Sequence, residues 1–267
     1  MKTAVLLCMG LMAIASMPAR EVILLGAQDV RDPVPQFAVT AGGVLTFEVL
    51  IPASLDRSMI AVGLWQISGS LTLPLGDPVA VTEPSDVHGI TPVRLEFPEL
   101  ERKTRVLVKF TTKDEPRTIL GLAQVQVHPP LDWTPIARKV KKEGPRLLVF
   151  GRNATLLDFL KAREIECADN GENPPGQLDR DTLTLGSIST KDWEERKDRI
   201  STDGGSLLVF VSDSDALPGV HRSPAGEGAI TKITLPVLAM LANDPRGEDL
   251  LFQLIEQHLH SAPAANP

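Results

Sequence analysis

The apolar residues of this chain change their spacing at a proline-rich stretch in its middle. Before that stretch they alternate with polar residues, as in "VRLEFPE" (93–99), where Val93, Leu95 and Phe97 share one face. A period of two is typical of a β-strand with one buried face. After the stretch, wholly apolar strands alternate with segments of helical spacing. The change predicts two domains of different fold class, joined by a linker at residues 131–145.

The first predicted domain, residues 20–130, is a β-sandwich. Six or seven segments of period two occur there, separated by turn sequences such as "PASLDRS" and "KDEP". Short strands at this spacing favour an all-β, immunoglobulin-like sandwich. Trp65 lies in one of these strands, "MIAVGLWQIS", and we expect it to be a core residue.

The second predicted domain, residues 146–260, is a flavodoxin-like α/β fold with a doubly wound sheet. "RLLVF" and "SLLVFVSD" are apolar on both faces, as central parallel strands are. Helical spacing follows in "NATLLDFLKARE" and in "DPRGEDLLFQLIEQHL", where Asp244 is placed to cap the helix and Pro245 occupies its first turn. The linker before this domain leaves open a short helix in "IARKVKK", and residues 261–267 are expected to be a disordered tail.

The first nineteen residues have the layout of a secretory signal peptide. Lys2 precedes an apolar run that ends in small residues, with Ala13 and Ala15 spaced as A-x-A. We therefore expect a periplasmic or secreted protein, with an uncleaved N-terminal anchor as the alternative. The run is shorter than the ~20 residues of a membrane span, and no later segment reaches that length. Removal of residues 1–19 leaves Cys167 as the single cysteine, which predicts a small buried side chain and no internal disulfide.

Charge and motifs exclude several chemistries. The net charge of -7 is unlike that of a nucleic-acid-binding protein. Neither a G-x-G-x-x-G nor a phosphate-binding loop occurs, and G-x-S-x-G is absent too. His258 and His260, two apart near the end of a predicted helix, fall on different faces, and a zinc site needs more ligands. We therefore predict neither a cofactor nor a metal.

Two turns at the carboxyl ends of the predicted central strands carry the candidate binding residues. Ligands of open α/β sheets bind beyond these strand ends. The first turn supplies a helix cap and a lone glycine whose simplest role is a tight turn, with a sugar or anion contact as the alternative. The second has two carboxylates but lacks the further ligands of a calcium site. The candidates are Gly151, Arg152, Asn153, Thr155, Ser212, Asp213 and Asp215.

Residues 146–260 resemble the class I glutamine-amidotransferase-like branch of flavodoxin-like folds. The resemblance lies in "LLVFGRNATLLDFL", "GGSLLVFVSDSDALPG" and "ITKITLPVLAMLANDPRGEDLLFQLI". Catalytic members of that branch place a cysteine on an elbow after a central strand and pair it with a histidine. Here the strand ends in "VFVSDSD", and His221 has no thiol partner. The resemblance implies a degenerate domain that kept the fold and lost the catalytic residues.

Two functions follow from these features. The first is an exported, non-catalytic binding or interaction protein of the bacterial cell envelope, whose partners are envelope proteins or a small ligand. The alternative is a secreted hydrolase of glycans or peptides, with Asp213 or Asp215 and His221 as acid and base. The missing catalytic motifs favour the first function, and the sequence predicts neither the ligand nor the oligomeric state.

Overall fold

The computed structural model is mostly β, with mixed sheets and several helices, and it forms two compact units. The first unit ends at Pro130 and the second begins at Leu131. The residues that the structure describes are 22–26, 34–142, 145–151, 153–212 and 218–261. The predicted signal peptide, 1–19, lies outside them. Among the described residues, no helix combines the length and the apolar character needed to cross a membrane.

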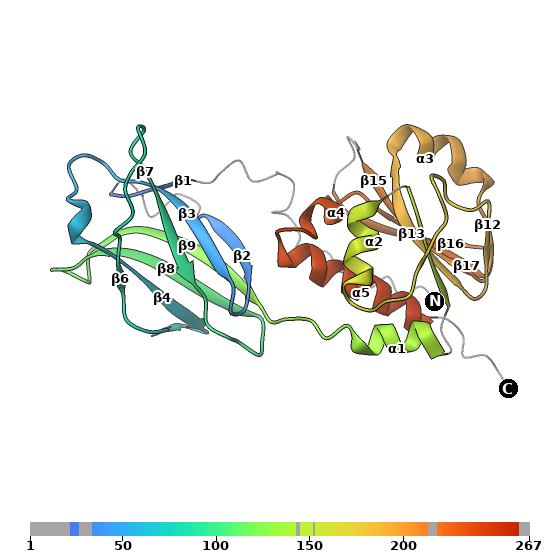
Figure 1. The fold of residues 1–267 in the computed structure, drawn as a ribbon, viewed down its shortest axis with the longest axis horizontal. Coiled ribbons are helices and arrows are strands. Elements are labelled where there is room, and N and C mark those ends of the chain that lie inside the picture. The colour runs from blue at the N-terminus through green and yellow to red at the C-terminus, as the bar shows by residue number, and fades with distance from the viewer. Residues whose placement is uncertain (1–21, 27–33, 143–144, 152, 213–217, 262–267) are drawn as a thin grey trace. The chain divides into compact units, whose positions relative to one another are not determined.

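The first unit, called here the sandwich unit, packs two sheets around one core (Figure 1). The smaller sheet has the order β1 (Val22–Leu24), β3 (Val44–Leu50), β7 (Ile90–Glu96). The larger sheet has the order β2 (Gln36–Thr40), β9 (Ile119–His128), β8 (Thr104–Thr112), β4 (Ile60–Ser68), β5 (Leu71–Pro74). Strand β6 (Val79–Ala80) also pairs with β4. A short 3-10 helix, Arg57–Met59, precedes β4 in the chain. Alternate residues of both sheets fill the core, as the period of two predicts.

The prediction that Trp65 is a core residue is wrong. Val62 and Leu64 face the core from β4, so Trp65 has the opposite parity and is half-buried on the outside of the sheet. Its ring lies on Gly63, where an added Cβ would be 2.6 Å from it. Lys109 Nζ sits 4.5 Å from the ring centroid, an arrangement that a cation–π attraction stabilises.

The second unit, called here the α/β unit, is built on a six-stranded sheet. Five neighbouring strands are parallel and the last, β16, is antiparallel. The order across the sheet is β11 (Ala168–Asp169), β10 (Arg146–Phe150), β13 (Thr182–Ser189), β15 (Ser206–Ser212), β17 (Gly228–Ile233), β16 (Val220–Ala225). A separate parallel pair joins β12 (Gln177–Asp179) to β14 (Ser201–Asp203).

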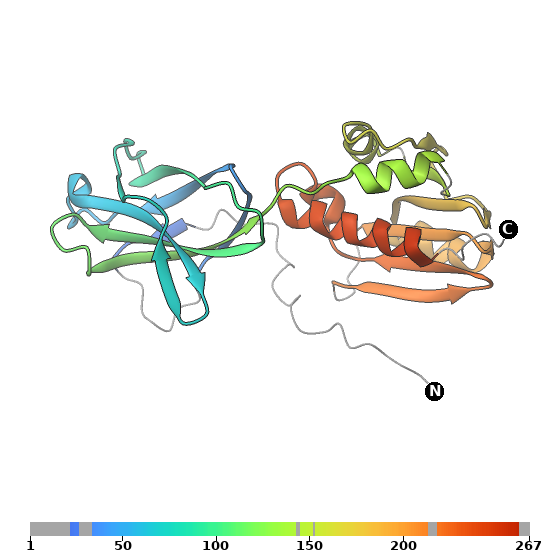
Figure 2. The same cartoon turned by 90° about the horizontal axis from the view of Figure 1, so that it is seen from below.

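Helices cover both faces of this sheet (Figures 1 and 2). One core joins the sheet to α1 (Thr134–Lys142), α2 (Ala154–Lys161), α4 (Val237–Met240) and α5 (Pro245–Ser261). The other joins it to α3 (Thr190–Arg196), which a short 3-10 helix, Lys197–Arg199, extends, and to β12. Leu208 belongs to the first core and Val209 to the second, so the prediction of a strand buried on both faces is confirmed for β15.

The stretch predicted as a linker, 131–145, is part of the α/β unit. Its residues Trp133 and Ile136 are buried in the core shared with α2 and α5. The short helix that the sequence allowed in "IARKVKK" is present as α1. Most of its residues are polar or basic, so its apolar side is short and gives a weak signal in the sequence. One other boundary differs from expectation: α5 runs on to Ser261, the first residue of the predicted tail, and the rest of that tail lies outside the described residues.

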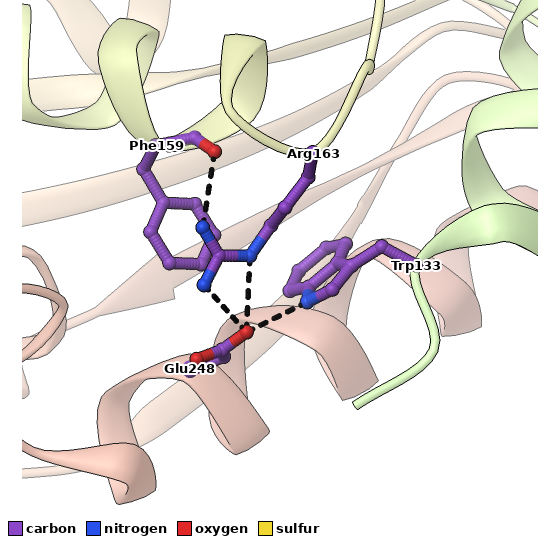
Figure 3. A network of polar contacts seen from close by, with 4 residues as sticks. All are labelled: Trp133, Phe159, Arg163 and Glu248. Carbon is purple, nitrogen blue, oxygen red and sulfur yellow. Dashed lines mark hydrogen bonds and ion pairs between the residues drawn. The ribbon is translucent and has the colours of Figure 1, made fainter. Parts of the chain in front are cut away.

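A polar network holds α1 to the rest of the unit, and Figure 3 shows its four residues. Glu248 Oε1 accepts a hydrogen bond from Trp133 Nε1 at 2.8 Å and two from Arg163, at 3.0 Å from Nε and 2.7 Å from Nη2. The Arg163 guanidinium also stacks on the Phe159 ring, 3.5 Å from its centroid. The Phe159 and Phe252 rings make T-shaped contacts with the Trp133 ring at centroid distances of 5.5 and 5.0 Å.

Candidate functional site

Gly151, the first predicted site residue, has a structural role at the carboxyl edge of the parallel strands. Its φ of 86° favours glycine, and its N–H donates to the Gly171 carbonyl at 2.8 Å. A Cβ at this position would stand 2.3 Å from the carbonyl oxygen of Ser187 on the neighbouring strand β13. Glycine is therefore required because two backbones approach closely here, which agrees with its predicted role in a tight turn.

Asn153 caps helix α2 with one end of its amide and contacts β13 with the other. Its Oδ1 accepts from the Leu156 N–H at 3.0 Å, and its Nδ2 donates to Ser187 Oγ at 3.3 Å. Asn153 therefore supplies the helix cap that the sequence predicts in this turn. Thr155, in the first turn of α2, is exposed.

The described side chains at the end of β15 are also engaged by the fold. Ser212 Oγ donates to the Ile188 carbonyl at 3.4 Å, while the Ser212 carbonyl accepts from Thr190 Oγ1 at 2.9 Å. Beside it, Ser189 caps α3 by accepting from the Asp192 N–H at 3.1 Å. The sequence analysis missed Ser187 and Ser189, although two serines alternating at the end of "TLTLGSIS" were a visible signal.

Three predicted site residues, Arg152, Asp213 and Asp215, lie outside the described residues, so their roles remain predictions. The histidine of the hydrolase alternative, His221, is exposed on β16 opposite Lys232. Cys167 is only half-buried, and burial raises the pKa of its thiol. Within the described ranges, no three His, Cys, Asp or Glu side chains gather closely enough to hold a metal ion.

A cavity of about 100 Å³ lies at the opposite edge of the sheet, where β13, β15 and β17 begin. We call it the amino-edge pocket. Its volume suits several water molecules or one small ligand. Its lining comes from the starts of these strands, the turn before β13, strand β16 and the end of α5. The main polar side chains of the lining are Arg180, Ser206, Arg222, Glu227 and His258.

His258 is the most unusual group of this pocket because one of its ring nitrogens is buried without a partner. Its side chain is 5% exposed, and Nε2 lies 3.1 Å from Thr231 Oγ1. Nδ1 has no hydrogen-bond partner among the residues that the structure describes. Burial, assisted by the charge of Arg222, lowers the pKa of His258 from 6.5 to about 4. The imidazole is therefore neutral at neutral pH, with one nitrogen as donor and the other as acceptor.

The charged residues around His258 leave the pocket with one net positive charge. Two arginines and one glutamate line it. Arg180 forms an ion pair with Glu227, which neutralises both. Across the described residues, no carboxylate lies within ion-pairing distance of Arg222. The lining of the pocket therefore combines a cation, a serine and a buried imidazole with an unpaired nitrogen.

Sequence reasoning missed this site, although one signal for it was present. His258 lies near the end of α5, as expected, but its side chain is buried. The spacing of Leu251, Leu254 and Ile255 extends to position 258, so His258 belongs to the buried stripe of the helix. The arginines could not be predicted as neighbours because they lie on a turn and an edge strand far apart in the sequence.

No family model matches this chain, and no curated protein does. Among solved structures, the extracellular domain of the voltage-gated sodium channel beta4 subunit is 11% identical, over 39% of this chain and 100% of that chain, with a TM-score of 0.23. A sialyltransferase from Photobacterium damsela is 11% identical, over 72% of this chain and 36% of that chain, with a TM-score of 0.20. Neither likeness is close enough to support an argument about fold or function.

Proposed function

We propose that this chain is an exported, non-catalytic binding protein of the bacterial cell envelope, whose α/β unit takes a small ligand in the amino-edge pocket. The observation that carries the proposal is the unpaired Nδ1 of the buried His258. Leaving a buried polar atom unpaired costs about 1–3 kcal/mol. A ligand that forms a hydrogen bond with this nitrogen recovers that free energy. A histidine with a purely structural role would already have both ring nitrogens paired, so it would gain nothing from a ligand.

The fold assignments belong to the same proposal. When β16 is set aside, the parallel strands have the order 2-1-3-4-5 in chain numbering, which supports a flavodoxin-like α/β unit. The parallel pairing of β2 with the last strand, β9, in a two-sheet packing supports an immunoglobulin-like sandwich unit. Strand β15 ends in a serine, whereas catalytic amidotransferase-like enzymes have a cysteine after the corresponding strand. This difference supports a relative of that branch that has lost its nucleophile.

The hydrogen bonds at the carboxyl edge favour a non-catalytic role for that edge. In α/β enzymes this edge holds the reacting groups. Here Asn153, Ser189 and Ser212 already use their polar atoms to cap helices and to join neighbouring strands. A ligand there would have to compete with these contacts, whereas the amino-edge pocket has an unmet hydrogen bond.

Ligand binding is tested by thermal unfolding of the mature full-length chain with a panel of sugars, nucleotides, small carboxylates, phosphate and polyols. A ligand at a hundredfold its dissociation constant stabilises the fold by about 2.7 kcal/mol. We expect at least one ligand to do so, and to lose most of the effect in Ser206→Val. A panel without any stabilising ligand, or stabilisation that Asn153→Ala abolishes and Ser206→Val leaves intact, would contradict the proposal.

Export is tested by N-terminal sequencing of the protein recovered outside the cytoplasm. We expect a new N-terminus near residue 20. The control carries Leu6→Arg and Leu7→Arg, which interrupt the apolar run and should retain the full-length chain inside the cell. An intact N-terminus on membrane-bound protein would support the uncleaved anchor instead.

A further inference from the structure

We infer that the ligand of the amino-edge pocket is a small oxyanion, a carboxylate or a phosphate group, held between the Arg222 guanidinium and the His258 Nδ1–H. The inference rests on the proposed function and adds the chemical class of the ligand. The volume of about 100 Å³ admits a small ion or the acidic end of a larger molecule.

Strand pairing brings the two proposed ligand-binding groups to one place. Arg222 of β16 stands directly opposite Thr231 of β17, and residues opposite each other in a ladder share a face of the sheet. The Thr231 hydroxyl is hydrogen-bonded to His258 Nε2 on that same face. The guanidinium and the imidazole therefore flank the same threonine and line the same cavity.

The charges of the pocket favour an anion over a cation or a neutral ligand. Its one carboxylate, Glu227, is already paired with Arg180, whereas Arg222 has no acidic partner among the described residues. A guanidinium recognises carboxylate and phosphate oxygens through paired N–H donors. The Ser206 hydroxyl, at the start of β15, adds a donor that can serve either kind of oxyanion.

The contact with Thr231 lets the neutral imidazole act as a donor toward the pocket. When the Thr231 hydroxyl donates to Nε2, the imidazole proton resides on Nδ1, and Nδ1–H is the group without a partner. An anion that contacts Nδ1 selects this tautomer, because only this tautomer has a donor at that atom. The histidine thus requires no positive charge to bind the oxyanion.

The test is isothermal titration of the mature full-length chain with inorganic phosphate, with acetate and with glycerol, at low and at high sodium chloride. We expect phosphate or acetate to bind, salt to weaken binding, and Arg222→Ala to weaken it about ten- to a hundredfold, as loss of a charge-assisted contact does. Arg105→Ala, which removes the same charge from an exposed position of the sandwich unit, is the matched control and should bind as the unaltered protein does.

Each outcome decides one part of the argument. Binding of phosphate alone or acetate alone identifies the kind of oxyanion and supports the inference. Binding that Arg222→Ala leaves unchanged overturns it. If only glycerol or another neutral member of the panel binds, and Ser206→Val abolishes that binding, the proposed function stands and the oxyanion inference falls. If nothing binds, both fall.

The proton on His258 gives a second measurement that needs no substitution of a buried residue. In the ¹⁵N NMR spectrum of the chain saturated with the bound oxyanion, we expect Nδ1 to carry the proton and Nε2 to be unprotonated. A proton on Nε2 in the saturated protein would overturn the role of Nδ1 as donor.

Discussion

The two edges of the α/β sheet differ in how completely their polar groups are paired. At the carboxyl edge, Asn153 and Ser189 cap helices, and Gly151 brings two strands close enough that no side chain fits between them. At the amino edge, His258 is buried beside Arg222, and within the described part of the chain its Nδ1 has no hydrogen-bond partner and Arg222 has no acidic one. The contrast teaches that structural hydrogen bonds can occupy the described polar groups at the edge where such a fold usually binds its ligands, while an unpaired polar atom lies at the other edge.

Gly151→Ala should cause the largest loss of stability and would break the carboxyl edge. The new Cβ meets the Ser187 carbonyl at 2.3 Å, and an alanine also has to adopt a φ of 86°. Together the clash and the backbone strain should cost about 4 kcal/mol in the free energy of unfolding. Gly171→Ala is the control, since its φ is 79° but nothing lies within 4 Å of the new Cβ. Equal losses for the two variants in urea unfolding would show that the close approach is not what requires Gly151.

Acidification should next destabilise the amino edge through His258. Its pKa is about 4 in the folded protein and near 6.5 in the unfolded chain, so the unfolded chain binds the proton more readily. The stability is complete above pH 6.5 and falls as the pH drops toward 4, by about 3 kcal/mol in all.

His258→Gln checks this dependence, because glutamine cannot be protonated in that range. The difference between the two proteins in urea-unfolding free energy, measured from pH 7 to pH 4, isolates the histidine from other titrating groups. A difference that stays constant with pH would mean that His258 is not buried as a neutral imidazole.

Glu248→Ala should leave partly buried polar groups unpaired in the network of Figure 3, as Nδ1 of His258 is unpaired in the unaltered protein. The substitution leaves Trp133 Nε1 and Arg163 without their shared acceptor. We expect a loss of about 2 kcal/mol, because the pair is partly exposed and water compensates for some of the lost contacts. Glu248→Gln keeps an oxygen acceptor and should lose less. A thermal unfolding curve unchanged by the alanine would argue that the network adds nothing to stability.

Asn153→Ala should have the smallest effect and separates the two edges. Loss of the helix cap should cost about 1 kcal/mol, and Asn153→Asp, which preserves a capping oxygen, should cost less. Phosphate or acetate binding should be unchanged in both variants, because the carboxyl edge is not the proposed ligand site. Weaker binding in Asn153→Ala would instead indicate that the ligand binds at the carboxyl edge, where the sequence predicts the binding residues.

The sequence predicted elements whose signal is local and failed where the signal depends on distant partners. Asp244 and Pro245 begin α5 as expected, with the Arg246 N–H donating to Asp244 Oδ1 at 2.9 Å. Trp65 was assigned to the wrong face because Leu64 beside it is apolar as well, so the alternation alone does not fix its phase.

The candidate site could be predicted only in part for the same reason. The capping role of Asn153 follows from its position before a helical segment. The amino-edge pocket instead depends on which strands are neighbours, since pairing of β16 with β17 is what brings Arg222 to His258. That hairpin has no distinctive pattern in the sequence, because all but one of the residues of β16 are exposed.

The docking of Trp133 against Phe159 and Phe252 has a consequence for how this gene can be shuffled. A recombination event that transplants the α/β module by its obvious proline-flanked boundary, after Pro145, would leave α1 behind. The rings of Phe159 and Phe252 would then face water and make the transplanted module prone to aggregate. Recombination before Leu131 keeps α1 and Trp133 with the α/β unit. The segment that must be inherited together therefore begins before the first strand of the sheet.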